Sequence, residues 1–118
     1  MFEPTNNCEV TFNGKNYPCP ISMAMDLIGG RWKGVILYYL QDEEKRFSEL
    51  KQLMPTITEM TLSIQLKQLE KDGFISRTVY GDRPPIKVVY ALTDFGNSFK
   101  PVLDALSLWS HQMVGQLP

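Results

Sequence analysis

The sequence predicts an α+β fold, mainly α-helical, built around a winged helix-turn-helix. Leu62, Leu66 and Leu69 recur at intervals of four and three residues, which places them on one side of a helix against a core. A shorter apolar helix precedes this one across Pro55, and two β-branched and aromatic runs follow it, separated by Gly81-Asp82-Arg83-Pro84-Pro85. Helix, tight turn, helix, strand, loop and strand is the element order of a winged helix-turn-helix with a two-stranded β-wing.

Length and composition are those of one globular domain. A chain of 118 residues can bury a core without disulfide or metal staples, so we expect a single winged-helix domain over residues 1–118. Within it we expect an N-terminal arm at 1–18, the helix-turn-helix with its wing at 47–92, and a C-terminal dimerisation helix at 94–117.

Several classes of protein are disfavoured. No apolar run is long enough to span a bilayer and the first residues do not resemble a signal peptide, so we expect a cytoplasmic protein without a membrane partner. Cys8, Cys19 and His111 are too scattered to make a metal site, and no cofactor is expected. No motif supplies paired carboxylates, a nucleophile with a base, or a phosphate-binding glycine loop, so the chain is not expected to be an enzyme.

The net charge of −1 at pH 7 counts against nucleic-acid binding, which is usually done by a basic domain or patch. The electrostatic footprint depends on where the charges lie. Between residues 67 and 87 there is a small basic excess of five side chains over three: Lys67, Lys71, Arg77, Arg83 and Lys87 against Glu70, Asp72 and Asp82. We therefore expect modest nonspecific affinity for DNA, with specific affinity that depends on two copies of the chain on one site.

The N-terminal stretch predicts a β-hairpin around Asn13-Gly14, because this dipeptide favours a two-residue hairpin turn. Such a turn places Phe12 opposite Lys15 and, by the same register, Cys8 opposite Cys19. The proline at position 18 weakens this last rung, because it cannot donate to the ladder. An unstructured arm is the alternative.

A helix is expected over Pro20–Ile28. Proline suits the first helical turn, which makes Cys19 the expected N-cap, and Gly29-Gly30 ends the helix. Apolar side chains lie on two sides of it, which favours burial against a partner chain as well as its own subunit. They are Ile21, Ala24, Met25 and Ile28 on one side, and Met23 and Leu27 on another.

Three more helices are expected before the wing. The apolar side of the first is Trp32, Val35, Ile36, Tyr39 and Leu40, and the charged turn 41–44 ends it. Ser48 is expected to cap the second, whose apolar side is Leu50 and Leu53. Thr58 is expected to cap the third, which ends at Gly73.

Strands are expected at Ile75–Tyr80 and Val88–Leu92, with 81–85 as the wing tip. Thr93 is expected to cap a last helix that Pro101 kinks or divides. Its apolar stripe is wider than one small domain can cover, so a homodimer is the expected assembly. The stripe is Phe95, Phe99, Val102, Leu106, Trp109, Met113 and Leu117.

The side of the 58–71 helix that faces away from the leucines is polar, weakly basic and partly apolar, which suits a DNA major groove. It carries Met60, Thr61, Ile64, Lys67, Gln68 and Lys71. Residues expected to read bases are Thr61, Ile64, Gln65 and Gln68. Residues expected to support them or to contact phosphate are Ser63 and Lys67, with Arg83 at the wing and Lys33, Lys51 and Lys87 as weaker phosphate contacts. A solvated face is the alternative, against which the apolar Met60 and Ile64 argue.

A family resemblance follows from ordered sequence blocks: CPISMAMDLIGGRWKGVIL, RFSELKQLMPTITEMTLSIQLKQLEKDGFISRTVY, PP and YALTDFG. The chain resembles the HxlR-type family of bacterial transcriptional regulators, winged-helix relatives of the MarR group, from roughly Cys19 to Trp109. The resemblance implies a homodimeric DNA-binding regulator, usually a repressor and sometimes an activator, whose effector is an oxidant, an electrophile or a small molecule. Two recognition helices related by a two-fold axis require an inverted-repeat operator with half-sites spaced by roughly 10 base pairs or a little more.

The chain departs from the family pattern at four places. Arg31 stands for lysine in the family's Gly-Gly-Lys-Trp-Lys signature, whereas Ser63, Gln65 and Leu66 fit the usual pattern. Met60 stands where the family commonly has a basic residue and Ile64 where it has glutamine, which predicts a different operator preference. Ile64 can meet a thymine methyl group. The wing also looks one residue longer than usual around Ile86.

Cys19 has the sharpest chemistry in the sequence. The positive end of a helix dipole favours the thiolate of an N-terminal cysteine, and Cys19 also matches the sensor cysteine of redox-responsive HxlR-type members. A half-buried cysteine without regulatory consequence is an equally weighted alternative. Cys8 is either a resolving partner or incidental.

The alternative function is a winged-helix protein-interaction module that has lost specific DNA binding. The net charge of −1 and the apolar Met60 and Ile64 are compatible with it. Salt dependence separates the two functions, because DNA binding weakens steeply as salt rises.

Overall fold

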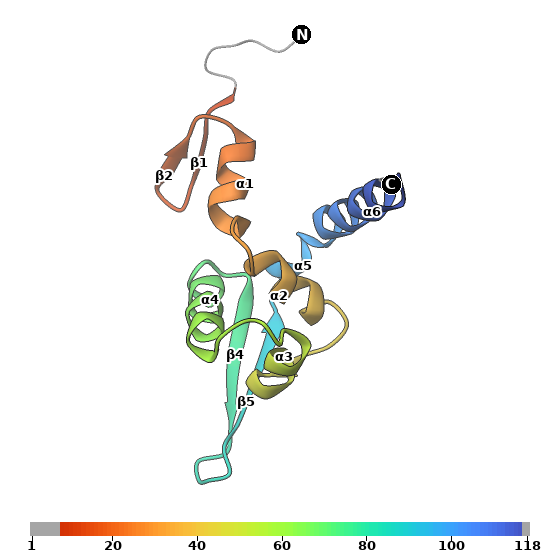
Figure 1. Ribbon diagram of the computed structural model, residues 1–118. Coiled ribbons are helices and arrows are strands. Elements are labelled where there is room, and N and C mark those ends of the chain that lie inside the picture. The colour runs from red at the N-terminus through yellow and green to blue at the C-terminus, as the bar shows by residue number, and fades with distance from the viewer. Residues whose placement is uncertain (1–7, 117–118) are drawn as a thin grey trace. The chain divides into compact units, whose positions relative to one another are not determined.

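The computed structural model describes residues 8–116, so the first part of the predicted arm and the predicted stripe residue Leu117 lie outside the described residues. The chain divides into two compact units, one that ends at Arg31 and one that begins at Trp32. Figure 1 shows the elements of each unit.

The first unit begins with the predicted hairpin. Strands β1 (Val10–Phe12) and β2 (Lys15–Tyr17) are antiparallel, with Phe12 opposite Lys15 as predicted. Asn13 and Gly14 both have positive φ, 52° and 76°, which is the backbone of a type I′ hairpin turn. The ladder ends at the pair Val10 and Tyr17, so it does not extend to the predicted rung between the two cysteines.

Helix α1 (Pro20–Ile28) follows with Cys19 as its N-cap, as predicted. The hairpin is tied to this helix through Asp26, whose carboxylate accepts a hydrogen bond from the Tyr17 hydroxyl at 2.8 Å and pairs with the Lys15 ammonium at 3.2 Å. Tyr17 is buried, and its hydroxyl remains satisfied by the Asp26 carboxylate.

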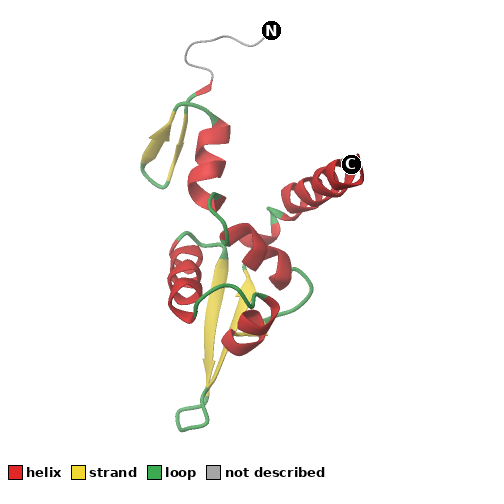
Figure 2. Cartoon of the chain, in the orientation of Figure 1, coloured by secondary structure: helices red, strands yellow, loops and turns green. Residues whose placement is uncertain are grey.

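The second unit combines helices with a three-stranded antiparallel sheet (Figure 2). The helices are α2 (Lys33–Leu40), α3 (Phe47–Leu53), α4 (Glu59–Lys71), α5 (Asp94–Asn97) and α6 (Lys100–Gln116). The strands are β3 (Lys45–Arg46), β4 (Ile75–Tyr80) and β5 (Lys87–Leu92), in the order β3-β5-β4. The predicted wing strands are therefore confirmed, with β5 one residue longer than expected.

Strand β3 was not predicted, and it extends the two-stranded wing into a three-stranded sheet. It pairs Lys45 with Tyr90 and Arg46 with Val89. Two charged residues beside a charged turn show no alternation and no β-branched side chain, so β3 carries no local signal. It forms because the edge of β5 has backbone groups free to pair with it.

The core of the second unit is built around the three leucines of α4. Leu62, Leu66 and Leu69 are 0–1% exposed, as their spacing predicted. Other buried side chains around them come from every neighbouring element: Ile36, Leu37, Leu40, Leu50, Met54, Ile57, Phe74, Ile75, Val89 and Leu103. Helix α2 packs against α3, α4, β5 and α6, and α4 packs against β4.

Two predicted apolar faces are partly wrong. Helix α2 buries Leu37 completely and leaves Val35 37% exposed, although the sequence pattern places Val35 on the core side. Helix α3 buries Leu50 but leaves Leu53 40% exposed, and Met54 after the helix is buried instead. Short helices give too few turns for spacing to decide which of two adjacent apolar residues faces the core.

The start of α3 also differs from the prediction. Arg46, not Ser48, precedes the helix, and the Glu49 carboxylate accepts a hydrogen bond from the Arg46 backbone N–H at 2.8 Å. Because β3 extends through Arg46, the helix begins directly after the strand and Ser48 lies inside its first turn.

Both predicted ends of α4 are confirmed. The Thr58 hydroxyl accepts from the Thr61 backbone N–H at 3.1 Å. At the other end the Phe74 N–H reaches the Leu69 carbonyl at 2.9 Å, and the Gly73 N–H reaches the Glu70 carbonyl at 3.1 Å. This is a Schellman motif, which requires the positive φ of 87° that Gly73 adopts.

The C-terminal segment divides as Pro101 predicted. Thr93 caps α5, its hydroxyl accepting from the Gly96 N–H at 3.0 Å, and α6 begins at Lys100, so Pro101 lies in the first turn of a new helix. Gly96 is required here because a Cβ would lie 2.1 Å from the Phe74 carbonyl oxygen. Phe74 also packs against Phe95 with ring centroids 4.7 Å apart.

Candidate nucleic-acid interface

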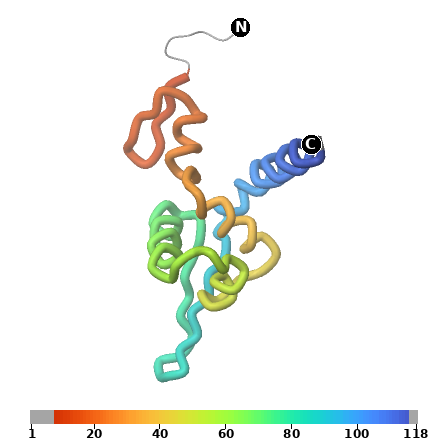
Figure 3. Tube along the Cα trace, viewed as in Figure 1, coloured from red at the N-terminus to blue at the C-terminus, as the bar shows by residue number. Residues whose placement is uncertain are grey.

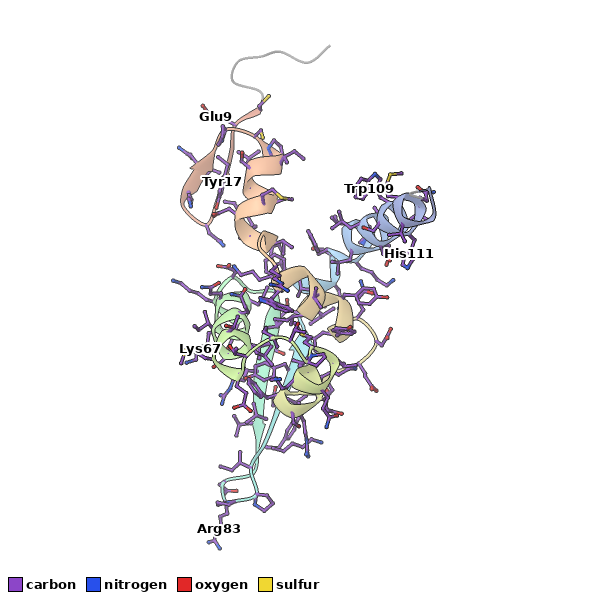
Figure 4. The ribbon with its side chains drawn as sticks, viewed as in Figure 1. Glu9, Tyr17, Lys67, Arg83, Trp109 and His111 are labelled. Carbon is purple, nitrogen blue, oxygen red and sulfur yellow. The ribbon has the colours of Figure 1, made fainter. Side chains whose placement is uncertain are left out.

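Helix α4 presents two different faces. Opposite the buried leucines, Met60 is 75% exposed and Ile64 46% exposed, and Lys67 and Gln68 beside them are also exposed. Figure 4 shows Lys67 projecting outward from α4. A face of mixed polar and apolar side chains on a helix held by three core leucines can enter a major groove without disturbing the fold.

Three more residues of α4 were predicted to contact DNA, Thr61 and Gln65 as base readers and Ser63 as a supporting or phosphate contact, and they lie at the edges of this face. Thr61, Ser63 and Gln65 are half-buried. The Thr61 hydroxyl accepts a hydrogen bond from the Thr58 hydroxyl at 2.9 Å, which orients it and leaves its own hydrogen available to an external acceptor. Thr61 therefore belongs both to the N-terminal cap of α4 and to the face predicted to contact DNA.

The wing extends beyond the helices, and its tip is the loop between β4 and β5 (Figure 3). Arg83 is exposed and lies at the end of this loop in Figure 4. Lys87 at the base of the loop lies over the Tyr80 ring, with Nζ 5.8 Å from the ring centroid. Of the lysines predicted as weaker phosphate contacts, Lys33 and Lys51 are half-buried, and the Lys51 ammonium donates to the Pro55 carbonyl at 3.5 Å.

The structure adds residues that were not assigned a role from sequence. A cleft of about 290 Å³ between α4 and the sheet is lined by Ser63, Lys67, Glu70, Arg77 and Tyr90. Arg77 stands opposite Tyr90 in the β4–β5 ladder. Arg77 belongs to the small basic excess of residues 67–87, but only the packing of α4 against β4 brings it beside α4.

The Cys19 thiol lies at the N-terminus of α1 as expected. Its sulfur accepts a hydrogen bond from the Ser22 backbone N–H at 3.4 Å and lies 3.6 Å from the Ser22 hydroxyl oxygen. These two hydrogen bonds, the backbone one first, hold the pKa of Cys19 below that of an ordinary cysteine. Cys8 and Cys19 are both half-buried.

Exposed apolar side chains concentrate on two helices. Ile21 and Met25 on α1 are 67% and 58% exposed. On α6, Leu106, Leu108, Trp109 and Val114 are 51–73% exposed. No helix of residues 8–116 is long and apolar enough to cross a membrane.

Fold and surface together define a winged helix-turn-helix protein of the DNA-binding class. The chain belongs to the HxlR-like helix-turn-helix family, which it matches over residues 27–117. It is therefore a transcriptional regulator of the HxlR type and not an enzyme.

Individual relatives are similar over most of their length. The chain is 47% identical to the HTH-type transcriptional regulator YdeP of Bacillus subtilis over 94 residues, covering 80% of this chain and 73% of YdeP. The redox regulator HypR in its oxidized form is 40% identical with a TM-score of 0.75, covering 80% of this chain and 96% of that one. The reduced form of YodB from B. subtilis is 36% identical with a TM-score of 0.69, covering 80% of this chain and 92% of that one.

Proposed function

We propose that this regulator binds an inverted-repeat operator as a homodimer, with α4 of each protomer in a major groove and the chain acting as one winged-helix DNA-binding domain. The observation that carries the proposal is the division of α4 into a buried leucine side and an exposed side bearing Met60, Ile64 and Gln68. Base readers in this proposal are Thr61, Ile64, Gln65 and Gln68. Phosphate or supporting contacts are Ser63, Lys67 and Lys87, with Arg83 in the minor groove or on the backbone.

The apolar surfaces of α1 and α6 support the homodimer. A stable interface buries roughly 1,600 Å² in total and has an apolar centre rich in aromatic residues and methionine. Trp109 is 61% exposed and Met25 is 58% exposed, and both are residue types found at interface centres. Large apolar side chains exposed to water are unfavourable, so burial against a second protomer would stabilise them. Dimerisation also places two recognition helices on one DNA site, which compensates for the small basic excess of each chain.

Fluorescence-anisotropy binding to DNA from upstream of the gene and its neighbours, with random DNA as competitor, tests the proposal. Gln68→Ala should lower the ratio of operator to random affinity by roughly 5- to 150-fold per half-site, because a lost bidentate base contact is worth roughly 1–3 kcal/mol. Arg83→Ala should weaken both kinds of DNA alike and reduce the salt slope, because a wing cation meets the backbone or groove regardless of sequence.

An equal loss on operator and random DNA for Gln68→Ala contradicts its role as a base reader. If the wild-type protein prefers no DNA fragment and its binding does not depend on salt, the result supports the protein-interaction module. Met60 and Ile64 would then form the contact surface for a protein partner.

We propose further that the regulator responds to oxidants through Cys19. HypR, to which the chain is similar, is a redox regulator. The Cys19 thiolate would attack one sulfur of an oxidised low-molecular-weight disulfide, forming a mixed disulfide and releasing the other half as a thiolate. The hydrogen bond from the Ser22 N–H favours the thiolate that this step requires.

Alkylation of Cys19 should reach half its maximal rate at a lower pH than alkylation of an ordinary thiol. A depressed pKa leaves more thiolate at any pH below the ordinary value, so the rate profile moves toward acid. Ser22→Ala removes the side-chain hydrogen bond and should move the profile partly back toward alkaline pH. Iodoacetamide labelling followed by mass spectrometry, in a Cys8→Ser background, measures both profiles. Cys19 that stays unmodified after a mild disulfide-forming oxidant removes the sensor role.

A further inference from the structure

We propose that the cleft between α4 and β4 binds a phosphate of the DNA backbone beside the major groove, with Arg77 and Lys67 as its cationic ligands. This inference rests on the proposed function, because it places α4 in that groove. It assigns to Arg77 a phosphate-binding role that the sequence pattern did not suggest.

The geometry brings the donors together from three elements. Ser63 and Lys67 are one helical turn apart on α4, Arg77 is on β4, and Tyr90 is opposite Arg77 on β5. The Schellman turn at Gly73 reverses the chain so that β4 runs back along α4, which is why a strand residue lies beside the helix. The resulting space of about 290 Å³ is large enough for a phosphate group with its water.

The donor set is that of a phosphate contact. Neither Lys67 nor Arg77 forms an ion pair with any residue in 8–116, and the hydroxyls of Ser63 and Tyr90 have no hydrogen-bond partner there. Both cations are exposed, whereas both hydroxyl residues are half-buried. The two unpaired cations exceed the charge of the one anion, Glu70, so the cleft has a net positive charge, and two hydroxyl donors add to it. Arginine, lysine, serine and tyrosine all contact phosphates in DNA-binding proteins.

The position of the cleft selects a backbone phosphate of duplex DNA as its ligand. An α-helix with side chains is about 10–12 Å wide and the major groove about 12 Å, so a helix in the groove has its flanks against the two phosphate walls. Ser63 and Lys67 lie on the flank of α4 between the base-reading face and the sheet. A phosphate on that wall would therefore meet Lys67 first and then the guanidinium of Arg77, which can donate two parallel hydrogen bonds.

The first test is the salt dependence of binding. Arg77→Gln should weaken operator and random DNA to the same degree and lower the slope of log affinity against log salt by about 2 per dimer, because each lost phosphate contact accounts for about 0.9 and the dimer has two. The matched control is Lys100→Gln, which removes a charge from α6 where Lys100 pairs with Asp104 at 3.2 Å. This control should leave the slope unchanged.

Glu70→Gln separates a phosphate site from a merely structural role of Arg77. In a phosphate site the Glu70 carboxylate opposes binding, so its neutralisation should raise affinity a few-fold. If Arg77 served only to hold α4 through Glu70, both substitutions would lower the melting temperature and both would weaken binding. Thermal melts of the two variants are measured alongside, and we expect neither to change.

Replacing operator phosphates one at a time by neutral methylphosphonate locates the contact. Wild-type affinity should fall at one position in each half-site, and Arg77→Gln should lose less affinity than the wild type at that position alone, because Lys67 still contacts the same phosphate. An unchanged salt slope for Arg77→Gln, or weaker binding by Glu70→Gln, overturns the inference while wild-type binding stands. Wild-type protein without salt-sensitive binding instead removes the proposed function on which the inference rests.

Discussion

Trp109→Glu should convert the regulator from a dimer to a monomer and weaken operator binding by at least about 100-fold, because a second recognition helix on the same site raises affinity by factors of that order. Trp109 is 61% exposed on α6 and lies among other exposed apolar side chains, so a second protomer is its expected cover. A carboxylate buried there without a cation would be strongly unfavourable. Sedimentation at micromolar concentration and anisotropy on full and half operators measure the two effects.

The control for this substitution is His111→Glu, which adds the same charge to the same helix. Two residues along a helix correspond to about 200° of rotation, so His111 lies on the other side of α6 from Trp109, as Figure 4 shows. His111 is exposed and its ring nitrogen lies 2.8 Å from the Ser107 carbonyl, within its own helix. A dimer that survives Trp109→Glu with unchanged operator affinity would rule out α6 as the interface.

Leu66→Ala should lower the free energy of unfolding by roughly 2–5 kcal/mol, a large part of the total for a small domain. Leu66 is 1% exposed at the centre of the core, so truncation removes buried methyl groups and leaves a cavity. Urea denaturation at fixed protein concentration measures the change, since the stability of a dimer depends on concentration.

Ile64→Ala truncates the same helix on its other face and serves as the comparison. Ile64 is 46% exposed, so its removal should change stability by less than about 1 kcal/mol while weakening operator binding. A thymine-to-uracil replacement in the operator should weaken wild-type binding and leave Ile64→Ala unaffected, because only the thymine methyl group is lost. If Ile64→Ala destabilises as much as Leu66→Ala, the division of α4 into two faces is wrong.

Local chemistry explains the parts of the fold that could be predicted. Asn13-Gly14, Thr58 and Gly73 each stabilise their own backbone, the first in a turn and the others at helix ends, through bonds to residues within a few positions. Such signals do not depend on the rest of the molecule. The leucine spacing of α4 is similarly reliable because the helix is 13 residues long and repeats its pattern over several turns.

The errors have a common physical cause in contacts between residues distant in sequence. Ser48 is a good capping residue, but pairing of Arg46 with Val89 starts the helix earlier. The burial of Leu37 in place of Val35 is decided by the elements that pack on α2. In each case tertiary packing or strand pairing was stronger than a weak local preference.

The sequence by itself determined the order of the helices and of the hairpin and wing strands, the faces of α4, the thiol at the start of α1 and the family to which the regulator belongs. Each of these rests on caps, periodicity or ordered motifs within a short span. Only the tertiary structure decided that β3 completes the sheet and that Arg77 and Tyr90 meet Lys67 in one cleft. Those arrangements depend on the turn at Gly73 and on strand register. Both bring together residues that are distant in sequence and that no local pattern predicts to be neighbours.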